Sequence, residues 1–372
     1  MTIGIEATKA HEREKTGVGW YCYYIVKEIG KIIDSRTKLW LYVNPQARIT
    51  NYQLLITNTP RCQNVAVKQL AWLPRKFWTQ VRLSYEMLAK PPDVLFIPAH
   101  LPPLIHPKKL VVTVHDLAFK QYPEVYSKRE LRLQEWGVQR VLKKAWRIIT
   151  PSEFTKNEVC KWYPRHKKDT IFVIPHGVIK VQNSKLKTKN YNSKLKTIIY
   201  IGRLESKKNI VNLIKTFNIS KSCKLQVASY KLILIGSPGY GYEAIKKEID
   251  ASPYKNDIIQ TGWQDREEVA KHLHNATLFV FPSLYEGFGM PLLEAFATGT
   301  PVSCSDIPPL REVGADVPLY FNPRDPVDMA EKIQRLLTNP ELQKQKSAEG
   351  LARAREFSWK RAAEKTLDIL IA

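Results

Sequence analysis

The chain has 372 residues, which is enough for two domains of ordinary size. Hydrophobic residues make up 44% and charged residues 25% of it, proportions that exclude a disordered or fibrous protein. Its formal net charge of +23 is high, no apolar run reaches the about 18 residues of a membrane span, and the first residues do not resemble a signal peptide.

The five cysteines are scattered along the chain and form no Cys-x-x-Cys pair. Neither a disulfide framework nor a zinc ribbon is therefore expected. A reducing compartment suits such cysteines, so the sequence favours a cytoplasmic protein.

The basic excess is concentrated in one half of the chain. Residues 1–200 carry 35 basic and 14 acidic side chains, a net charge of +21, whereas residues 201–372 carry 23 and 21. Three anionic partners fit the first half, namely nucleic acid, an acidic membrane surface and a phosphorylated substrate. A solubility role accounts for the charge equally well.

Short apolar runs rich in β-branched residues recur, each followed by a longer amphipathic stretch. Runs of this kind are typical of parallel strands buried on both faces. The runs predicted as strands are 3–5, 39–43, 94–98, 110–115, 147–151, 171–175, 197–202, 231–236, 257–262, 278–282 and 301–304. Stretches between them, such as 129–145 and 325–338, have helical spacing. The alternation occurs in both halves and predicts two doubly wound α/β domains.

Residues 180–196 separate the two halves. This segment is polar and basic and repeats Asn-Ser-Lys-Leu-Lys-Thr, which is typical of an exposed linker. The sequence therefore predicts a first domain over residues 1–179, a linker, a second domain over 197–356 and a C-terminal helix over 357–372.

The most informative segment follows the predicted strand at 278–282. A turn with Glu286, Gly287 and Gly289 leads into a helix that begins near Met290. Glycines allow the backbone to approach a ligand closely, and a helix N-terminus favours an anion such as a diphosphate. Glu286 and Glu294 can accept hydrogen bonds from sugar hydroxyls.

The pattern Glu-Gly-Phe-Gly-Met-Pro-x-x-Glu-Ala-x-Ala-x-Gly-x-Pro-Val at 286–302 resembles the signature of retaining, nucleotide-sugar-dependent glycosyltransferases of the group 1 or family 4 type. The resemblance implies the GT-B fold, with two Rossmann-like doubly wound parallel-sheet domains facing across a cleft. It also implies that the C-terminal helix crosses back to the first domain.

Further segments resemble the family in the expected order, and they imply roles for individual residues. By this resemblance Arg203 and Lys208 grip the donor diphosphate, His115 faces the donor sugar, Glu286 holds sugar hydroxyls and Glu294 binds the ribose. The other implied donor-binding positions are Gly17 and Gly19 in a loop after the first strand, Gly236, Gly262, Gly287, Phe288, Gly289 and Met290.

Several of these positions also have an ordinary structural explanation. His115 fits a strand-end histidine bonded to backbone, Gly17 and Gly19 fit a turn, and Lys207 is interpreted as a solvated loop charge. The combination of these residues at motif spacing is what favours a site.

The implied reaction transfers a hexosyl unit to an acceptor hydroxyl with retention of configuration, in cell-surface glycan or glycolipid assembly. GDP-mannose is the first donor expected and a UDP-sugar the second. No metal is expected to be required, because no Asp-x-Asp triplet occurs and cationic side chains replace a divalent ion. The expected partners are the donor, a glycan or lipid-linked acceptor and, for the basic half, the anionic inner face of the plasma membrane.

Two alternatives stay open. A basic nucleic-acid-binding protein fits the charge, but no recognition-helix, zinc or aromatic-sheet motif accompanies it, so nucleic acid is not the expected partner. A GT-B sugar epimerase or phosphorylase is the second alternative, and the Glu286 to Glu294 segment favours a transferase over it.

Overall fold

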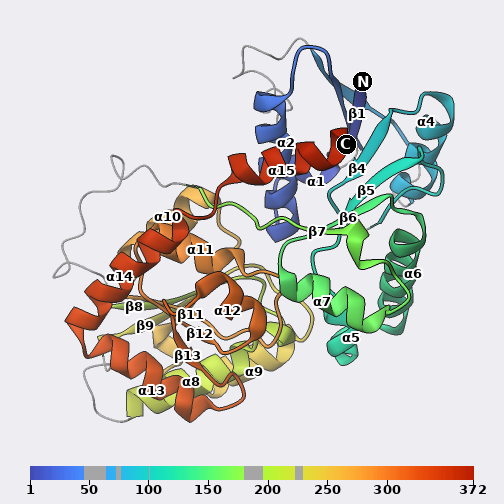
Figure 1. The fold of residues 1–372 in the computed structure, drawn as a ribbon. Coiled ribbons are helices and arrows are strands. Elements are labelled where there is room, and N and C mark those ends of the chain that lie inside the picture. Colours follow the sequence, from blue (N-terminus) through green and yellow to red (C-terminus); the bar gives the residue numbers. More distant parts are fainter. Residues whose placement is uncertain (46–63, 73–76, 100, 180–195, 223–228) are drawn as a thin grey trace. The chain divides into compact units, whose positions relative to one another are not determined.

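The computed structural model describes residues 1–45, 64–72, 77–99, 101–179, 196–222 and 229–372. The chain forms two compact units, each with many more contacts inside it than to the other (Figure 1). The first consists of Met1–Lys120, Ser127–Gly177 and Ser358–Ala372, and the second of Gln121–Tyr126 and Val178–Phe357. Residues 180–195 of the expected linker lie outside the described residues.

The first unit is built on a seven-stranded parallel sheet with the order β3-β2-β1-β4-β5-β6-β7. Its strands are β1 (Thr2–Glu6), β2 (Lys38–Val43), β3 (Val65–Gln69), β4 (Val94–Ile97), β5 (Lys109–Thr113), β6 (Arg147–Thr150) and β7 (Ile171–Val173). All four side chains of β4, and the three of β5 between Lys109 and Thr113, are apolar and buried, which explains why these sequences are continuous apolar runs.

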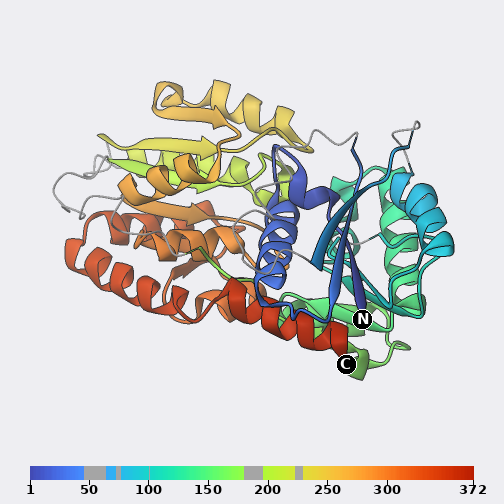
Figure 2. The ribbon, with the colours of Figure 1, turned by 90° about the horizontal axis from the view of Figure 1, so that it is seen from above.

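Helices cover both faces of this sheet, with α2 on one face and α4 and α6 on the other (Figure 2). The helical segments are α1 (Thr8–His11), α2 (Gly17–Ile32), the π-helical turn η2 (Trp78–Arg82), α4 (Leu83–Ala89), α5 (Ala118–Gln121), α6 (Lys128–Lys144), α7 (Glu153–Trp162), η4 (Lys168–Thr170) and α15 (Trp359–Ile371). The C-terminal helix α15 packs against α2 and contacts β4, so it belongs to the first unit.

One local expectation is wrong. Gly17 and Gly19 were expected in a loop after β1, but both lie in the first turn of α2. Thr16 precedes the helix in an extended conformation, and a short helix, α1, occupies part of the connection instead.

The second unit contains a six-stranded parallel sheet with the order β10-β9-β8-β11-β12-β13. Its strands are β8 (Thr197–Ile201), β9 (Lys231–Ile235), β10 (Ile258–Gly262), β11 (Leu278–Phe281), β12 (Val302–Ser305) and β13 (Leu319–Phe321). Its helical segments are η3 (Pro123–Val125), η6 (Ser206–Lys208), α8 (Ile210–Ser222), α9 (Tyr242–Ala251), η8 (Lys255–Asp257), α10 (Arg266–Asn275), α11 (Met290–Ala297), α12 (Pro308–Gly314), α13 (Pro326–Leu337) and α14 (Pro340–Ala354).

Both sheets reverse their direction of winding at one point, between β1 and β4 in the first unit and between β8 and β11 in the second. In doubly wound sheets ligands bind outside the carboxyl ends of the strands at such a point. The two parallel α/β sheets confirm the predicted fold class. A ligand site of the second unit is therefore expected among the residues that follow β8 and β11. Among the described residues no helix is long and apolar enough to cross a bilayer.

Candidate active site

Close backbone packing draws the carboxyl ends of β8, β9 and β10 together. The Gly202 N–H donates to the Ile235 carbonyl at 2.9 Å, and the Gly236 N–H donates to the Gly262 carbonyl at 2.9 Å. Gly236 has a φ of 144°, and a Cβ atom there would lie 2.0 Å from the Gly202 carbonyl oxygen. Only glycine fits this position, so Gly236 allows the strand ends to pack closely whether or not it contacts a ligand.

The loop after β8 carries a group of charged side chains. The hydroxyl of Tyr200 donates to the Arg203 carbonyl at 3.0 Å and so fixes the start of the loop. The Glu205 carboxylate then lies 3.8 Å from Arg203 Nε and 3.6 Å from Lys207 Nζ. The Arg203 side chain is 55% exposed, so its guanidinium remains open to an anionic ligand.

Lys207 differs from the sequence interpretation. Its side chain is only 19% exposed and faces Glu205, and its carbonyl accepts the Leu284 N–H at 2.9 Å. Its charge is therefore paired and largely shielded from solvent. Its backbone also joins the loop after β8 to the loop after β11.

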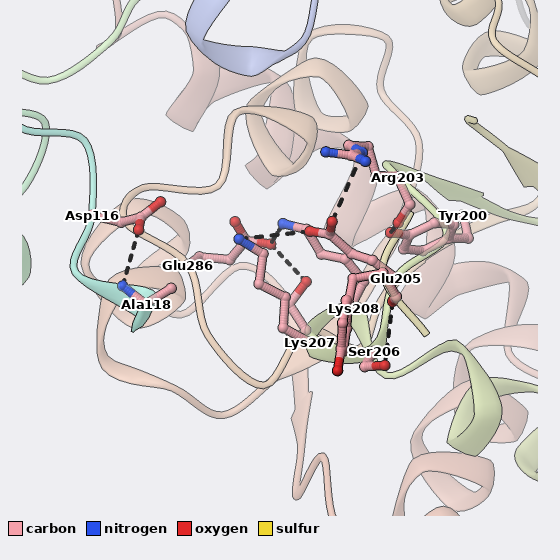
Figure 3. Close-up of polar contacts among 11 residues, drawn as sticks. Asp116, Ala118, Tyr200, Arg203, Glu205, Ser206, Lys207, Lys208 and Glu286 are labelled. Atoms are coloured by element: carbon pink, nitrogen blue, oxygen red, sulfur yellow. Dashed lines mark hydrogen bonds and ion pairs between the residues drawn. The ribbon is translucent and has the colours of Figure 1, made fainter. Parts of the chain in front are cut away.

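Lys208 and Glu286 form an ion pair between these same two loops. Lys208 Nζ lies 2.5 Å from Glu286 Oε1, and the Ser283 hydroxyl donates to the same oxygen at 2.6 Å. Figure 3 shows the two side chains pointing toward each other, with Arg203 and Glu205 on the adjacent part of the loop. The structure thus brings three predicted site residues to the winding reversal between β8 and β11.

The helix α11 begins at Met290, as the sequence indicated. Gly289 caps it with a φ of 97°, and a Cβ atom there would lie 2.6 Å from Leu310 Cδ2. Because glycine has no side-chain acceptor, the helix N-terminus carries no side-chain cap. The partial positive charge of this terminus therefore adds to that of the neighbouring cations.

Glu294, in the second turn of α11, pairs with Arg266, a residue that lies outside every sequence motif of the site. Arg266 Nη2 donates to Glu294 Oε1. Arg266 is the first residue of α10, and Asp265 caps that helix by accepting the Glu268 N–H at 3.0 Å. Nothing in the local sequence pattern links Arg266 to a carboxylate 28 residues away.

Residues 121–126 also contact the loop after β11. The Tyr122 hydroxyl donates to the Leu284 carbonyl at 3.1 Å, and its ring meets that of Tyr285 edge to face at 6.0 Å. The Tyr240 hydroxyl donates to the Glu124 carbonyl at 3.2 Å. This short segment therefore braces the backbone two residues before Glu286, a role the sequence did not indicate.

His115 lies in the first unit, in a buried aromatic cluster. Its Nε2 is 2.8 Å from the Pro98 carbonyl oxygen, and its ring meets Tyr21 edge to face at 4.8 Å. His176 and Trp359 stack on the same cluster at 5.8 Å. Burial, and to a smaller extent His115, hold the pKa of His176 well below its usual range, so both histidines belong to a tightly packed region.

Metal-ligating side chains are not grouped in the part of the chain that the structure describes. There, no three His, Cys, Asp or Glu side chains lie close enough together to hold an ion. The charge next to Glu286 comes from lysine and arginine side chains instead.

Comparison with protein-family models gives two matches. The model of glycosyl transferases group 1 matches residues 181–353, and the model of Glycosyltransferase Family 4 matches residues 43–179. The chain belongs to the group 1 glycosyltransferases. It is therefore an enzyme of the hexosyltransferase class, and the site at β8 and β11 lies within the first of these matches.

Individual relatives agree with this assignment. The glycosyltransferase is 29% identical to O-antigen chain mannosyltransferase B of Escherichia coli over 274 residues, which cover 70% of each chain. It is 25% identical over 321 residues to the O-antigen chain mannosyltransferase RfbU of Salmonella typhimurium, covering 84% of this chain and 85% of that one. Among solved structures, WaaG, a glycosyltransferase involved in lipopolysaccharide biosynthesis, shares the fold with a TM-score of 0.76 over all of both chains, at 13% identity.

Proposed function

We propose that this glycosyltransferase transfers a mannosyl unit from GDP-mannose to an acceptor hydroxyl, with retention of configuration, during assembly of a cell-surface glycan. The observation that carries the proposal is the Lys208–Glu286 pair beside Arg203 at the winding reversal of the second sheet. It offers cations for a diphosphate and a carboxylate for sugar hydroxyls in one place.

The cations serve the leaving group. As the glycosidic bond breaks, negative charge develops on the departing diphosphate, and preorganised charges placed there stabilise the transition state more than the ground state. Arg203 and Lys208 supply that charge, and the N-terminus of α11, at Gly289 and Met290, adds a further positive dipole. Because these groups are fixed by the sheet and its loops, they need little rearrangement during the reaction.

The carboxylates hold the donor. Glu286, whose position is fixed by Ser283 and Lys208, accepts hydrogen bonds from hydroxyls of the transferred sugar. Glu294, held by Arg266, accepts those of the ribose. Gly262, the last residue of β10, frames the nucleotide, and Phe288 is buried against Phe357 beneath the turn before α11.

The anomeric configuration is retained without a covalent intermediate between the sugar and the protein. The acceptor oxygen attacks the face of the sugar that the diphosphate leaves, and the diphosphate takes the proton of the acceptor hydroxyl. Donor charge is balanced by Arg203 and Lys208, so the reaction requires no divalent metal. Activity in excess chelator is the corresponding expectation.

The sugar and the acceptor are argued from the relatives. Two of them are named O-antigen chain mannosyltransferases, which supports mannose and a glycan or lipid-linked acceptor. A UDP-sugar is the second donor. The enzyme acts in the cytoplasm, in peripheral contact with the inner face of the plasma membrane.

A ligand screen followed by product analysis tests the proposal. Ligands that bind only the folded state raise its melting temperature, so GDP and GDP-mannose should raise it more than UDP-glucose or ADP-glucose do. The anomeric proton of the product should then show, by NMR, the configuration of the donor. A larger shift with UDP-glucose would move the assignment to the second donor. No shift with any nucleoside diphosphate, together with binding to DNA or RNA, would overturn the proposal.

A further inference from the structure

One side of η2 and α4 presents apolar side chains to solvent. Val81, Tyr85 and Leu88 are spaced four and three residues apart, which places them on one face of the helical segment. Tyr85 is 64% and Leu88 67% exposed, whereas Leu83 and Met87 on the opposite side are buried in the first unit. The segment therefore has two apolar faces, of which only one is buried.

Hydrogen bonds of Ser84, which lies beside Tyr85 on α4, join this helix to residues 104 and 105. The hydroxyl of Ser84 accepts the N–H groups of Leu104 at 2.8 Å and Ile105 at 3.2 Å. The Leu104 carbonyl in turn accepts Arg140 Nη2 at 2.5 Å, and the Arg140 guanidinium lies 5.8 Å from the ring centre of the exposed Trp136 on α6. Figures 1 and 2 both show α4 and α6 on the same side of the first sheet.

These residues form one surface, which we call the apolar face. It consists of Val81, Tyr85, Leu88, Leu104, Ile105 and Trp136, all exposed. Single exposed apolar side chains are ordinary, but a connected group of this kind marks an interaction site. Among the described residues, fourteen large hydrophobic side chains are exposed, and six of them are members of this one face.

Positive charge surrounds the apolar face. The helix α6 carries six lysine or arginine residues and two glutamates. Both glutamates are engaged: Glu130 in the capping box with Ser127, and Glu135 in an ion pair with Lys120 at 2.6 Å. The lysines at 90 and 108, next to α4 and to Ile105, are exposed.

The one acidic side chain of α4 adds no free negative charge. Glu86 lies 3.3 Å from Arg82 and 3.5 Å from Lys68, so two cations balance it. An occupant of the apolar face must therefore combine apolar surface with negative charge.

We propose that the apolar face docks the enzyme onto an anionic phospholipid bilayer. Apolar side chains of an amphipathic surface enter the boundary between headgroups and acyl chains, while lysine and arginine side chains bind the anionic headgroups. A second copy of the chain fits less well, because residues 1–200 carry a net charge of +21 and two such faces repel each other. The inference rests on the proposed function, since it names the surface by which the enzyme meets a membrane-bound acceptor.

Flotation with lipid vesicles tests the docking surface. The protein should bind vesicles that contain phosphatidylglycerol but not vesicles of phosphatidylcholine alone, and high salt should release it. Tyr85→Glu and Leu88→Glu should each lower the partition coefficient about tenfold. Lys90→Ala should lower it roughly fivefold, the factor expected for one charge at an anionic surface.

The matched control is Val327→Glu on α13 of the second unit, where the side chain is 54% exposed. It should leave vesicle binding unchanged, and all four variants should keep the melting temperature and its rise with GDP. Equal binding by Leu88→Glu and wild type, or no binding by wild type, would overturn the docking proposal while leaving the donor proposal intact. A dimer that light scattering detects and that Leu88→Glu dissociates would also overturn it, in favour of a second copy.

Discussion

Lys208 Nζ lies 2.5 Å from Glu286 Oε1, and this ion pair joins the loops that follow β8 and β11. Both side chains are largely buried, and the Ser283 hydroxyl fixes the shared oxygen. The pair therefore holds a cation and a carboxylate at a defined separation before a donor binds. Such preorganisation is the main way in which an enzyme stabilises developing charge.

The brace from Tyr122 predicts a moderate effect on turnover. Tyr122→Phe removes the hydrogen bond to the Leu284 carbonyl but keeps the ring against Tyr285. A single hydrogen bond contributes about 0.5–1.5 kcal/mol, so kcat should fall roughly two- to tenfold with little change in melting temperature. Steady-state kinetics measures this. Tyr242→Phe, which loses only a hydrogen bond to Gln260, is the control and should keep the wild-type kcat.

The Arg266–Glu294 pair predicts coupled effects on donor binding. If Arg266 acts by holding the Glu294 carboxylate, Arg266→Ala and Glu294→Ala should each raise the KM for the donor more than they lower kcat. The double variant should then be hardly worse than Glu294→Ala alone, because the two residues act as a unit. Strictly additive losses in a double-mutant cycle would mean that Arg266 contacts the donor independently.

The secondary structure was largely predictable, because most strands are buried on both faces and show as continuous apolar runs. β3 was missed because its side chains are mostly half-exposed, so Val65–Gln69 lacks an uninterrupted run. β13 was missed because it has only three residues, two of them half-buried. Both lie at an edge of their sheet, where burial, and with it the sequence signal, is weakest.

The candidate site was predictable only where it is local in sequence. The turn before α11 and the start of that helix at Met290 follow from glycine and proline placement over a few residues. The contacts of Tyr122 and Arg266 join positions 162 and 28 residues apart, and no periodicity or capping rule links such positions. Lys207 was misread because the burial of its side chain beside Glu205 depends on how the loop folds, which no local pattern shows.

Two glycines should respond in opposite ways to alanine. At Gly236 a Cβ atom would lie 2.0 Å from the Gly202 carbonyl oxygen and φ is 144°, so Gly236→Ala should lower the free energy of unfolding by more than about 2 kcal/mol. Gly30, inside α2, has open space around its Cβ position, so Gly30→Ala should raise it by about 0.5–1 kcal/mol. Urea unfolding compares the two, and a Gly236→Ala variant as stable as wild type would contradict the packing at the strand ends.

Buried His11 predicts a loss of stability in mild acid. Burial, with a smaller contribution from Lys15, lowers the pKa of His11 to about 4 in the folded state, against 6.5 for a free histidine. Between these values the unfolded chain binds a proton that the folded chain does not bind. The free energy of unfolding therefore falls as the pH falls through this window.

The effect of this one group should be about 2 kcal/mol between about pH 7 and about pH 5. His11→Gln removes the titrating group. Between about pH 7 and about pH 5 the free energy of unfolding of wild type should therefore fall by about 2 kcal/mol more than that of the variant. Urea unfolding at several pH values measures this difference. If the free energy of unfolding changed equally with pH in the two proteins, His11 would be protonated equally in the folded and unfolded chain, which would contradict the prediction.

The most direct test of the central claim is the initial rate of sugar transfer from GDP-mannose, measured in excess chelator, for wild type and for variants of the ion pair. Lys208→Ala and Glu286→Gln should each lower kcat by about 10²–10³, Lys208→Arg should recover part of the loss, and Lys215→Ala on the exposed side of α8 should have no effect. Near-wild-type rates for Lys208→Ala and Glu286→Gln would contradict the account, because catalysis would then not depend on the charges that the structure places at the ends of β8 and β11.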